Sequence, residues 1–326
     1  MDNQYNFIVR VNCMTYNHAP YIVDTMNGFT MQQTSFPFVC IIIDDASTDG
    51  EPDIISNYIE DNFDITNNSN TISKETDDYR FIFTRHKSNH NCFFVVILLK
   101  YNHYSIGKPK ASYFKEWSRT KYTAICEGDD YWIDPLKLQK QVNYLESHPE
   151  CGLVHTHVKE YIQKNNIFKD GLSGYNIKDI DTYFIWNPIR TLSTCYRTNL
   201  GRAYGLEIGR YHLWKMSDFP FWIYILMNSK IHFIPDVTGV YRVTDESASH
   251  SNSLQHRISF IYSSLSARLF LAKYYNKEYL TNRIRVNNLG WLITEYKKHG
   301  EKPPFWKCLK KYKSAMFRLG FLKDFI

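Results

Sequence analysis

Short apolar runs of strand length alternate with segments of helical periodicity through the first 150 residues. The apolar runs predict strands at Phe7–Met14, Phe38–Ile43, Tyr79–Thr84 and Tyr122–Cys126. Helices are predicted at 20–33, at 51–62, and from Pro135 onward with Asp134 as N-cap. The polar stretch 64–78 is expected to be a surface loop, while 85–108 carries no readable pattern. This alternation indicates an α/β fold whose mostly parallel, Rossmann-like sheet is flanked by helices.

The pattern changes after residue 150. Strands are predicted at 152–158, 189–196, 231–234 and 239–243, with an apolar helix at 214–226. Three helical segments follow, at 254–275, 278–299 and 304–320. We therefore expect one large domain made of two halves, 1–150 and 151–250, with a helical extension over 251–326.

Composition and charge narrow the class of protein. The chain has 326 residues, and the 44% that are hydrophobic suffice for a large core. Its seven cysteines form no CxxC pair, which favours reduced thiols over a disulfide frame or a zinc site. There is no signal-peptide pattern at the N-terminus, and the apolar run from Phe93 to Leu99 is too short to span a bilayer. A cytoplasmic protein, soluble or peripheral to a membrane, is expected.

The positive charge is concentrated at one end of the chain. The formal net charge is +6, and residues 302–326 hold seven basic side chains against one acidic one, which accounts for all of it. This distribution does not suit a nucleic-acid-binding face spread over a domain. A helix at 304–320 that mixes aromatic residues with lysines either lies on an anionic membrane surface or packs on the domain with a solvated basic face.

Polar and acidic residues follow several of the predicted strands at their carboxyl ends. They are Tyr16, Asp44, Asp45, Glu127, Asp129 and Asp130. In parallel α/β sheets, ligands bind at this edge. Carboxylates as close as Glu127, Asp129 and Asp130 repel one another unless a cation lies between them, and oxygen ligands of this kind suit Mg²⁺ or Mn²⁺. The alternatives are a solvated acidic loop at 127–130 and a simple turn at Asp44 and Asp45.

Five sequence blocks in order resemble the family 2 glycosyltransferases, which have the GT-A fold. They are Val11–Ile22, Ile41–Gly50, Cys126–Trp132 with Asp134 and Pro135, Ser217–Pro220, and Tyr241–Ser249. The second is close to the family's IVDDGSTDG block, and the third is similar to its DXD metal motif. Glu127 departs from this motif, because it stands where the family has the first aspartate.

The resemblance implies roles for individual residues. Tyr16 and Asp45 would contact the nucleotide base, while Asp129 and Asp130 would meet a divalent cation and the diphosphate, with Glu127 beside them at the nucleotide. Asp218 would be the general base of an inverting transfer, although an aspartate there also suits a plain helix N-cap. The family often has a histidine where this chain has Thr244, so either Arg242 or His250 would replace it at the diphosphate, or this contact is missing. Apart from the resemblance, Trp186 and Asn187 are expected to border the acceptor pocket, with core packing as the alternative for Trp186.

The implied activity is metal-dependent transfer of a sugar from a nucleotide-diphosphate sugar to an acceptor hydroxyl. A UDP-sugar is favoured as donor, and the acceptor would be a saccharide or a lipid-linked saccharide. The setting would be surface polysaccharide biosynthesis at the inner face of the cell membrane, with 302–326 as a peripheral membrane contact. Two other functions stay open: a sugar-nucleotide nucleotidyltransferase, and a sugar-nucleotide-binding protein without activity. The first usually has a Gly-rich phosphate loop after its first strand, where this chain has Thr15–His18.

Overall fold

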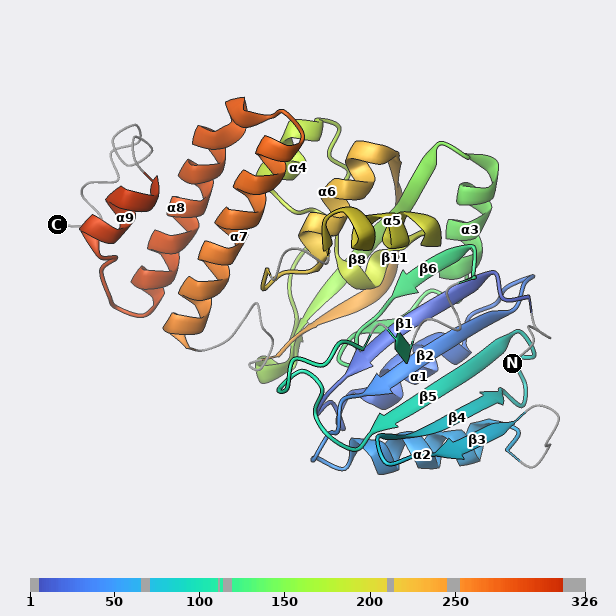
Figure 1. The fold of residues 1–326 in the computed structure, drawn as a ribbon. Helices are drawn as coiled ribbons and strands as arrows, with labels where there is room; N and C mark the ends of the chain where they lie inside the picture. The colour runs from blue at the N-terminus through green and yellow to red at the C-terminus, as the bar shows by residue number, and fades with distance from the viewer. Residues whose placement is uncertain are drawn as a thin grey trace.

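One large mixed sheet runs through the computed structural model, which describes residues 6–65, 71–110, 112–113, 119–209, 214–244 and 253–312 (Figure 1). Its strands lie in the order β3-β4-β5-β2-β1-β6-β10-β8-β11-β7, and β9 pairs with β8. Their bounds are β1 Val9–Thr15, β2 Phe38–Asp44, β3 Ile72–Glu75, β4 Tyr79–Arg85, β5 Cys92–Leu99, β6 Tyr122–Ile125, β7 Tyr131–Trp132, β8 Cys151–Ile162, β9 Ile167–Phe168, β10 Cys195–Arg197 and β11 Lys230–Val243.

The parallel strands β5, β2, β1 and β6 form the part of the sheet that positions the site. Every residue of β2 is buried, as expected for a strand covered on both faces. The register pairs Thr15 with Asp44 and Asn12 with Ile125. The carboxyl ends of β1, β2 and β6 therefore open at the same edge of the sheet, as the sequence predicted.

The sheet continues without a break into the second half of the chain. Strand β10 runs antiparallel between β6 and β8, and β8 pairs in parallel with β11. Strand β7, which directly follows the acidic residues, pairs with β11 through Tyr131 and Trp132. The acidic residues are thereby held between the two halves of one sheet.

Helices cover the sheet and extend beyond it (Figure 1). They are α1 Ile22–Thr30, α2 Glu51–Asn62, α3 Lys137–Ser147, α4 Ile180–Ile185, α5 Thr198–Glu207, α6 Asp218–Asn228, α7 Leu254–Tyr274, α8 Thr281–Lys298 and α9 Phe305–Tyr312. Helix α6 shares a hydrophobic core with the C-terminal helices, in which Trp222, Ile261, Leu292 and Tyr312 are all buried. The helical extension is thus packed against the domain.

Several predicted elements need correction. Residues 64–78, predicted to be a surface loop, include β3, and residues 85–108, for which no element was predicted, include β5. Helix α3 begins at Lys137, because a turn follows Asp134 in which the Asp134 Oδ1 accepts from the Leu136 N–H at 2.9 Å. The strands predicted at 231–234 and 239–243 are one bulged strand, β11. The strand predicted at 189–196 is a 3₁₀ turn at Thr191–Ser193 followed by β10.

The basic C-terminal segment is described only as far as residue 312. Within that part, Cys308 and Tyr312 of α9 are buried, and the Tyr312 hydroxyl donates to Asn288 Oδ1 of α8 at 2.8 Å. This arrangement is the expected alternative in which the helix packs on the domain. Residues 313–326 lie outside the described part of the chain. Every helix in the described part is too short or too polar to cross a bilayer.

Candidate active site

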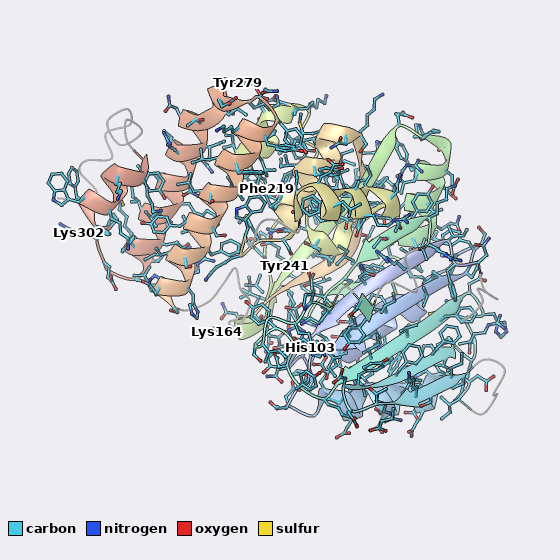
Figure 2. The ribbon with its side chains drawn as sticks, viewed as in Figure 1. His103, Lys164, Phe219, Tyr241, Tyr279 and Lys302 are labelled. Atoms are coloured by element: carbon cyan, nitrogen blue, oxygen red, sulfur yellow. The ribbon has the colours of Figure 1, made fainter. Side chains whose placement is uncertain are left out.

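A cleft with a volume of about 1970 Å³ opens at the carboxyl ends of β1, β2 and β6 and continues to the C-terminal helices. Its lining includes the predicted Tyr16, Asp45, Glu127, Asp129, Asp130, Asn187 and Asp218. In Figure 2, Phe219 and Tyr241, which also line it, lie between the main sheet and the C-terminal helices. Pockets for one drug-sized ligand are about 300–1,000 Å³, so this cleft has room for two substrates.

The acidic turn, residues 127–130, is fixed to the first strand and the first helix. The Gly128 N–H donates to the Met14 carbonyl at 3.0 Å. The Thr25 hydroxyl of α1 lies 3.0 Å from the Gly128 carbonyl and 2.6 Å from the Asp130 carbonyl. These contacts require close approach of the backbone, which explains a glycine inside the turn.

Replacement of Gly128 by alanine should distort this turn. An added Cβ would lie 2.1 Å from Thr15 Oγ1 and 2.6 Å from Thr15 Cβ. We expect Gly128→Ala to lower the free energy of unfolding by about 1–3 kcal/mol, as overpacking does elsewhere, measured by urea denaturation. Gly205→Ala on α5 is the matched control, because its Cβ would meet no atom within 4 Å. Equal unfolding free energies for the two variants would contradict this description of the turn.

The carboxylates of the acidic turn are crowded and partly or fully buried. Burial, together with Asp129 and Asp218, raises the pKa of Glu127 to about 7. Burial and the neighbouring acids Asp129 and Glu127 raise the pKa of Asp130 well above its usual range. Such crowding favours binding of a cation at this turn.

The turn fits a divalent cation held partly by its substrate. Among the side chains that the structure describes, no group of three or more His, Cys, Asp or Glu could hold a metal ion. Mg²⁺ needs only one or two carboxylates when substrate phosphates and water complete its shell. Asp129 is half-buried at the cleft, whereas Asp130 is only 2% exposed. Asp129 is therefore the better placed of the two for direct contact.

Arg242 lies behind the acidic turn. Its backbone N–H donates to Asp130 Oδ1 at 2.8 Å, and its Nη1 donates to the Asp129 carbonyl at 2.9 Å. Its Nη2 pairs with Asp24 Oδ2 of α1 at 2.6 Å. The guanidinium lies 4.8 Å from the ring centroids of Tyr21 and Tyr131, and it is absent from the cleft lining. In this structure Arg242 thus holds the turn, which differs from the predicted diphosphate contact. His250 lies outside the described residues.

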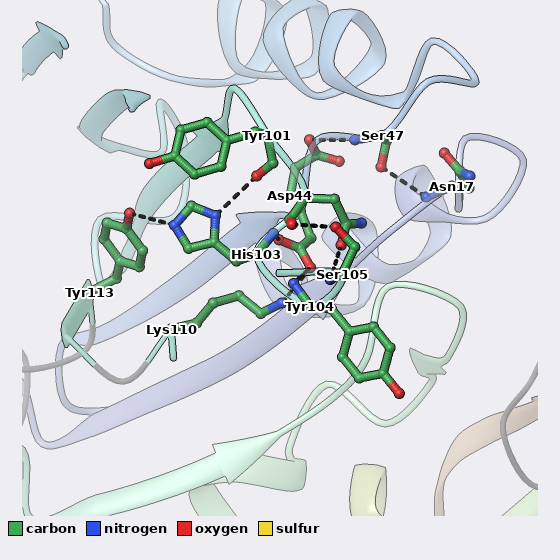
Figure 3. A network of polar contacts seen from close by, with 11 residues as sticks. Asn17, Asp44, Ser47, Tyr101, His103, Tyr104, Ser105, Lys110 and Tyr113 are labelled. Carbon is green, nitrogen blue, oxygen red and sulfur yellow. Dashed lines mark hydrogen bonds and ion pairs between the residues drawn. The ribbon is translucent and has the colours of Figure 1, made fainter. Parts of the chain in front are cut away.

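Asp45 is covered by a loop from the segment 85–108, whose role was not predicted. Its carboxylate accepts from the backbone N–H groups of His103 at 2.8 Å and Tyr104 at 3.1 Å, and it pairs with Lys110 (Figure 3). The His103 ring bonds the Tyr101 carbonyl at 2.9 Å and the Tyr113 hydroxyl at 3.1 Å. Since a carbonyl only accepts, Nδ1 carries a proton and donates it to Tyr101.

Two tyrosines are exposed beside Asp45. Tyr16 is 44% exposed and Tyr104 is 86% exposed, and both line the cleft. Free aromatic faces in a cleft suit a nucleobase, which stacks on a ring. Asp44 points elsewhere, because its Oδ2 accepts from the Ser47 N–H at 3.2 Å, and burial raises its pKa to about 6.

Glu51 of α2 is a further residue that the sequence did not single out. Its carboxylate accepts from the Thr15 hydroxyl, from the His18 N–H at 2.9 Å and from the Ser47 hydroxyl at 2.9 Å. It therefore joins the loops that follow β1 and β2. Only its place at the start of a helix after the Asp-rich block marks it in the sequence.

Asp218 begins α6 and faces the other end of the cleft. Its carboxylate is partly buried, and burial raises its pKa. The Asn187 amide Nδ2 donates to Asp218 Oδ2 at 3.4 Å. Ser217 occupies the N-cap position of α6. The structure thus brings the predicted acceptor residues Asn187 and Asp218 together, although they are 31 positions apart.

Helix α7 contributes a buried cation next to Asp218. Arg268 is 8% exposed, and its guanidinium lies 4.0 Å from the Phe219 ring centroid. It donates to the Phe184 carbonyl at 2.5 Å and to the Ser264 hydroxyl at 3.1 Å. Burial lowers the pKa of Arg268 to about 10, and Asp218 partly offsets that shift. The helical extension therefore forms part of the site.

Known proteins share this fold and part of this sequence. Residues 13–91 match the family model described as glycosyl transferase family 2. TarS 1-349 of S. aureus, solved with UDP-GlcNAc, has a TM-score of 0.53 and 16% identity, covering 96% of this chain and 92% of that one. Mannosyltransferase PcManGT from Pyrobaculum calidifontis, solved with GDP-Man and Mn²⁺, has a TM-score of 0.52 and 15% identity. The match covers 99% of this chain and 84% of that one. At such identities these two structures establish the fold.

The chain has the fold of these two glycosyltransferases, the GT-A fold. Over residues 13–91 the sequence is similar to glycosyl transferase family 2. Two uncharacterized proteins, Mb1547 of Mycobacterium bovis and Rv1520 of Mycobacterium tuberculosis, are each 32% identical over 192 residues. These alignments cover 56% of this chain and 45% of each relative, so the chain spans about half the length of the curated relatives it matches.

Proposed function

We infer that this protein transfers a sugar from a nucleotide-diphosphate sugar to an acceptor hydroxyl, with inversion at the anomeric carbon. The observation that carries this inference is one cleft lined by Tyr16, Asp45, the acidic turn and Asp218. A UDP-sugar is the favoured donor. TarS was solved with UDP-GlcNAc and PcManGT with GDP-Man and Mn²⁺, which supports a donor of this class.

The donor's nucleotide would bind at the first half of the cleft. The exposed ring of Tyr16 stacks on the base, and Asp45 accepts one N–H group at the lone pair that His103, Tyr104 and Lys110 leave. Asp129 and Asp130 would hold Mn²⁺ or Mg²⁺ with the diphosphate, and Glu127 lies beside them. When bound, such a cation stabilises the negative charge that grows on the leaving diphosphate.

Asp218 would act on the acceptor. The acceptor oxygen attacks the anomeric carbon while the bond from that carbon to the diphosphate breaks. Asp218 takes the hydroxyl proton as this bond forms, and Asn187 orients the carboxylate through its hydrogen bond. The acceptor is a saccharide or a lipid-linked saccharide, and the setting is surface polysaccharide synthesis at the inner face of the membrane.

Removal of the Asn187 amide should change the pH dependence of turnover. Asp218 accepts a proton only when ionised, so turnover falls as the pH drops through its pKa. The Asn187 hydrogen bond favours the ionised form, so its loss raises that pKa. We expect the acidic limb of the kcat profile of Asn187→Ala to move to higher pH, with donor affinity unchanged. An acidic limb at the wild-type position would exclude this role for Asn187.

Nucleotide binding tests the donor assignment. We expect calorimetry to show UDP binding in the presence of MnCl₂ and little binding after chelation with EDTA, with GDP weaker than UDP. Metal-independent binding of equal strength would remove the acidic turn from the donor site. A nucleotidyltransferase would instead produce a nucleoside triphosphate from the sugar nucleotide and pyrophosphate.

A further inference from the structure

The two halves of the cleft differ in charge. Around the donor half lie the carboxylates of Asp45, Asp49, Glu127, Asp129 and Asp130. The outer cleft, which we define as the lining from the turn after β8, the start of α6, and helices α7 and α8, is basic instead. Its basic residues are Lys164, Lys215, Arg257, Arg268, Lys297 and Lys298, and its acidic residues in the described lining are Asp218 and Glu295.

The two carboxylates, Asp218 and Glu295, do not neutralise these six cations. Arg257 holds the Glu295 carboxylate through two hydrogen bonds, of 2.7 and 3.1 Å, and Lys298 lies 3.1 Å from it. Arg268 is buried at the cleft without an acidic side chain in hydrogen-bond contact among the described residues. Lys164, Lys215 and Lys297 are exposed on separate elements. A charge of one sign inside a cleft concentrates ligands of the opposite sign.

Aromatic rings accompany the cations. Trp186 is 57% exposed and lines the cleft near Asn187. Trp291 of α8 also lines it and packs edge-to-face on Phe260 of α7, with ring centroids 6.0 Å apart. Exposed indole faces bind the apolar faces of sugar rings, while lysines attract anions as point charges. Figure 2 shows Lys164 at the lower end of the region between the C-terminal helices and the sheet.

We propose that the outer cleft binds an acidic saccharide, with carboxylate or phosphate groups, as the acceptor. The proposal rests on the transferase function inferred above and adds the chemical class of its second substrate. The sugar rings lie along Trp186 and Trp291, and the acidic groups face Lys164, Lys215 and Lys297. The cations line a concave cleft that leads to Asp218, which favours a saccharide chain over a flat bilayer surface.

A triple variant of the full chain tests the proposal. Lys164→Gln, Lys215→Gln and Lys297→Gln together remove the exposed cations and keep the pair of Lys298 with Glu295. The control variant replaces three exposed lysines that lie outside the cleft lining, Lys230, Lys273 and Lys307, by Gln. Trigalacturonate is the acidic probe and maltotriose the neutral one, with binding followed by tryptophan fluorescence at two salt concentrations.

We expect the wild type to bind trigalacturonate at least about tenfold more tightly than maltotriose, more weakly at high salt. The triple variant should lose about tenfold in affinity for trigalacturonate, while the control keeps it. UDP binding with Mn²⁺ should be equal in all three proteins. No binding of trigalacturonate, equal binding of the two probes, or equal loss in the control would overturn the proposal.

Two further measurements distinguish an acceptor site from a donor site and from a lipid-binding surface. If the triple variant lost UDP binding as strongly as trigalacturonate binding, the lysines would serve the donor, and the acceptor assignment would be wrong. The variant could instead keep trigalacturonate binding and lose its binding to anionic phosphatidylglycerol vesicles, with neutral phosphatidylcholine vesicles as the reference. In that case the cations would bind lipid headgroups, and the saccharide proposal would be wrong. A wild type that neither binds UDP nor releases it from UDP-sugars would reject the transferase function itself, which is a distinct result.

Discussion

Asp218→Asn should lower kcat by about a hundred- to ten-thousandfold, the range that general-base catalysis typically supplies. Asparagine keeps the size of the side chain but cannot take the acceptor's proton. The affinity for the donor should stay nearly unchanged, because the lost interaction is made only in the transition state. Steady-state kinetics with a saturating donor and a titration of UDP with Mn²⁺ measure the two effects separately.

The matched control for this prediction is Asp53→Asn. Asp53 lies in the first turn of α2, just as Asp218 lies at the start of α6. Asp53 is exposed and does not line the cleft. Wild-type kcat is expected for the control. If Asp218→Asn weakened nucleotide binding as much as turnover, Asp218 would belong to the donor site. Retention of the donor's anomeric configuration in the product would make the inverting mechanism wrong.

Asp129→Asn should remove most of the metal-dependent donor binding. Asp129 faces the cleft, whereas the Asp130 carboxylate is buried and also accepts the Arg242 N–H. Loss of a group that only supports a metal ligand already costs about 10–100-fold in metal affinity, so loss of a ligand should cost at least the upper part of that range. Titration of UDP at fixed Mn²⁺ measures this loss, and kcat should fall with it.

Asp130→Asn should give a second, different result. Its Oδ1 can still accept the Arg242 N–H, so the fold should survive, but the negative charge at the turn is reduced. Turnover should then be lost and Mn²⁺-dependent UDP binding greatly weakened. Asp53→Asn, which lies outside the cleft lining, is again the control. Full Mn²⁺-dependent binding by Asp129→Asn and Asp130→Asn would show that the turn does not hold the metal.

Local sequence patterns were enough to predict the strands and helices at the centre of the fold. Strands β1, β2 and β6 are apolar runs buried in the sheet, and α2 has the predicted bounds of Glu51 and Asn62. By contrast, β3 is exposed along its whole length, so it has no apolar signature. Strand β11 looked like two strands because Pro235 interrupts its pattern, and the structure has a bulge between Ile234 and Val237. The proposed boundaries at 150 and 250 stay a prediction.

Local patterns also predicted only part of the candidate site. Residues at strand ends could be predicted to meet, since parallel strands bring their carboxyl ends to one edge, and Tyr16, Asp45 and the acidic turn do line one cleft. The cover over Asp45 could not be predicted, because Lys110 comes from 65 positions away through a loop without periodicity. Arg268 was also missed, since no short-range pattern relates α7 to Asp218. The side-chain roles themselves stay predictions.

The most direct test of the central claim is nucleotide release from sugar nucleotides. The full chain would be incubated with UDP-GlcNAc, UDP-glucose or GDP-mannose, with MnCl₂ or with EDTA, and free UDP and GDP would be measured over time. We expect slow release of UDP from a UDP-sugar with Mn²⁺, no release with EDTA, and loss of the signal in Asp129→Asn. Absence of nucleotide release from every donor, or release that is unchanged by EDTA and by Asp129→Asn, would contradict the proposed transferase function.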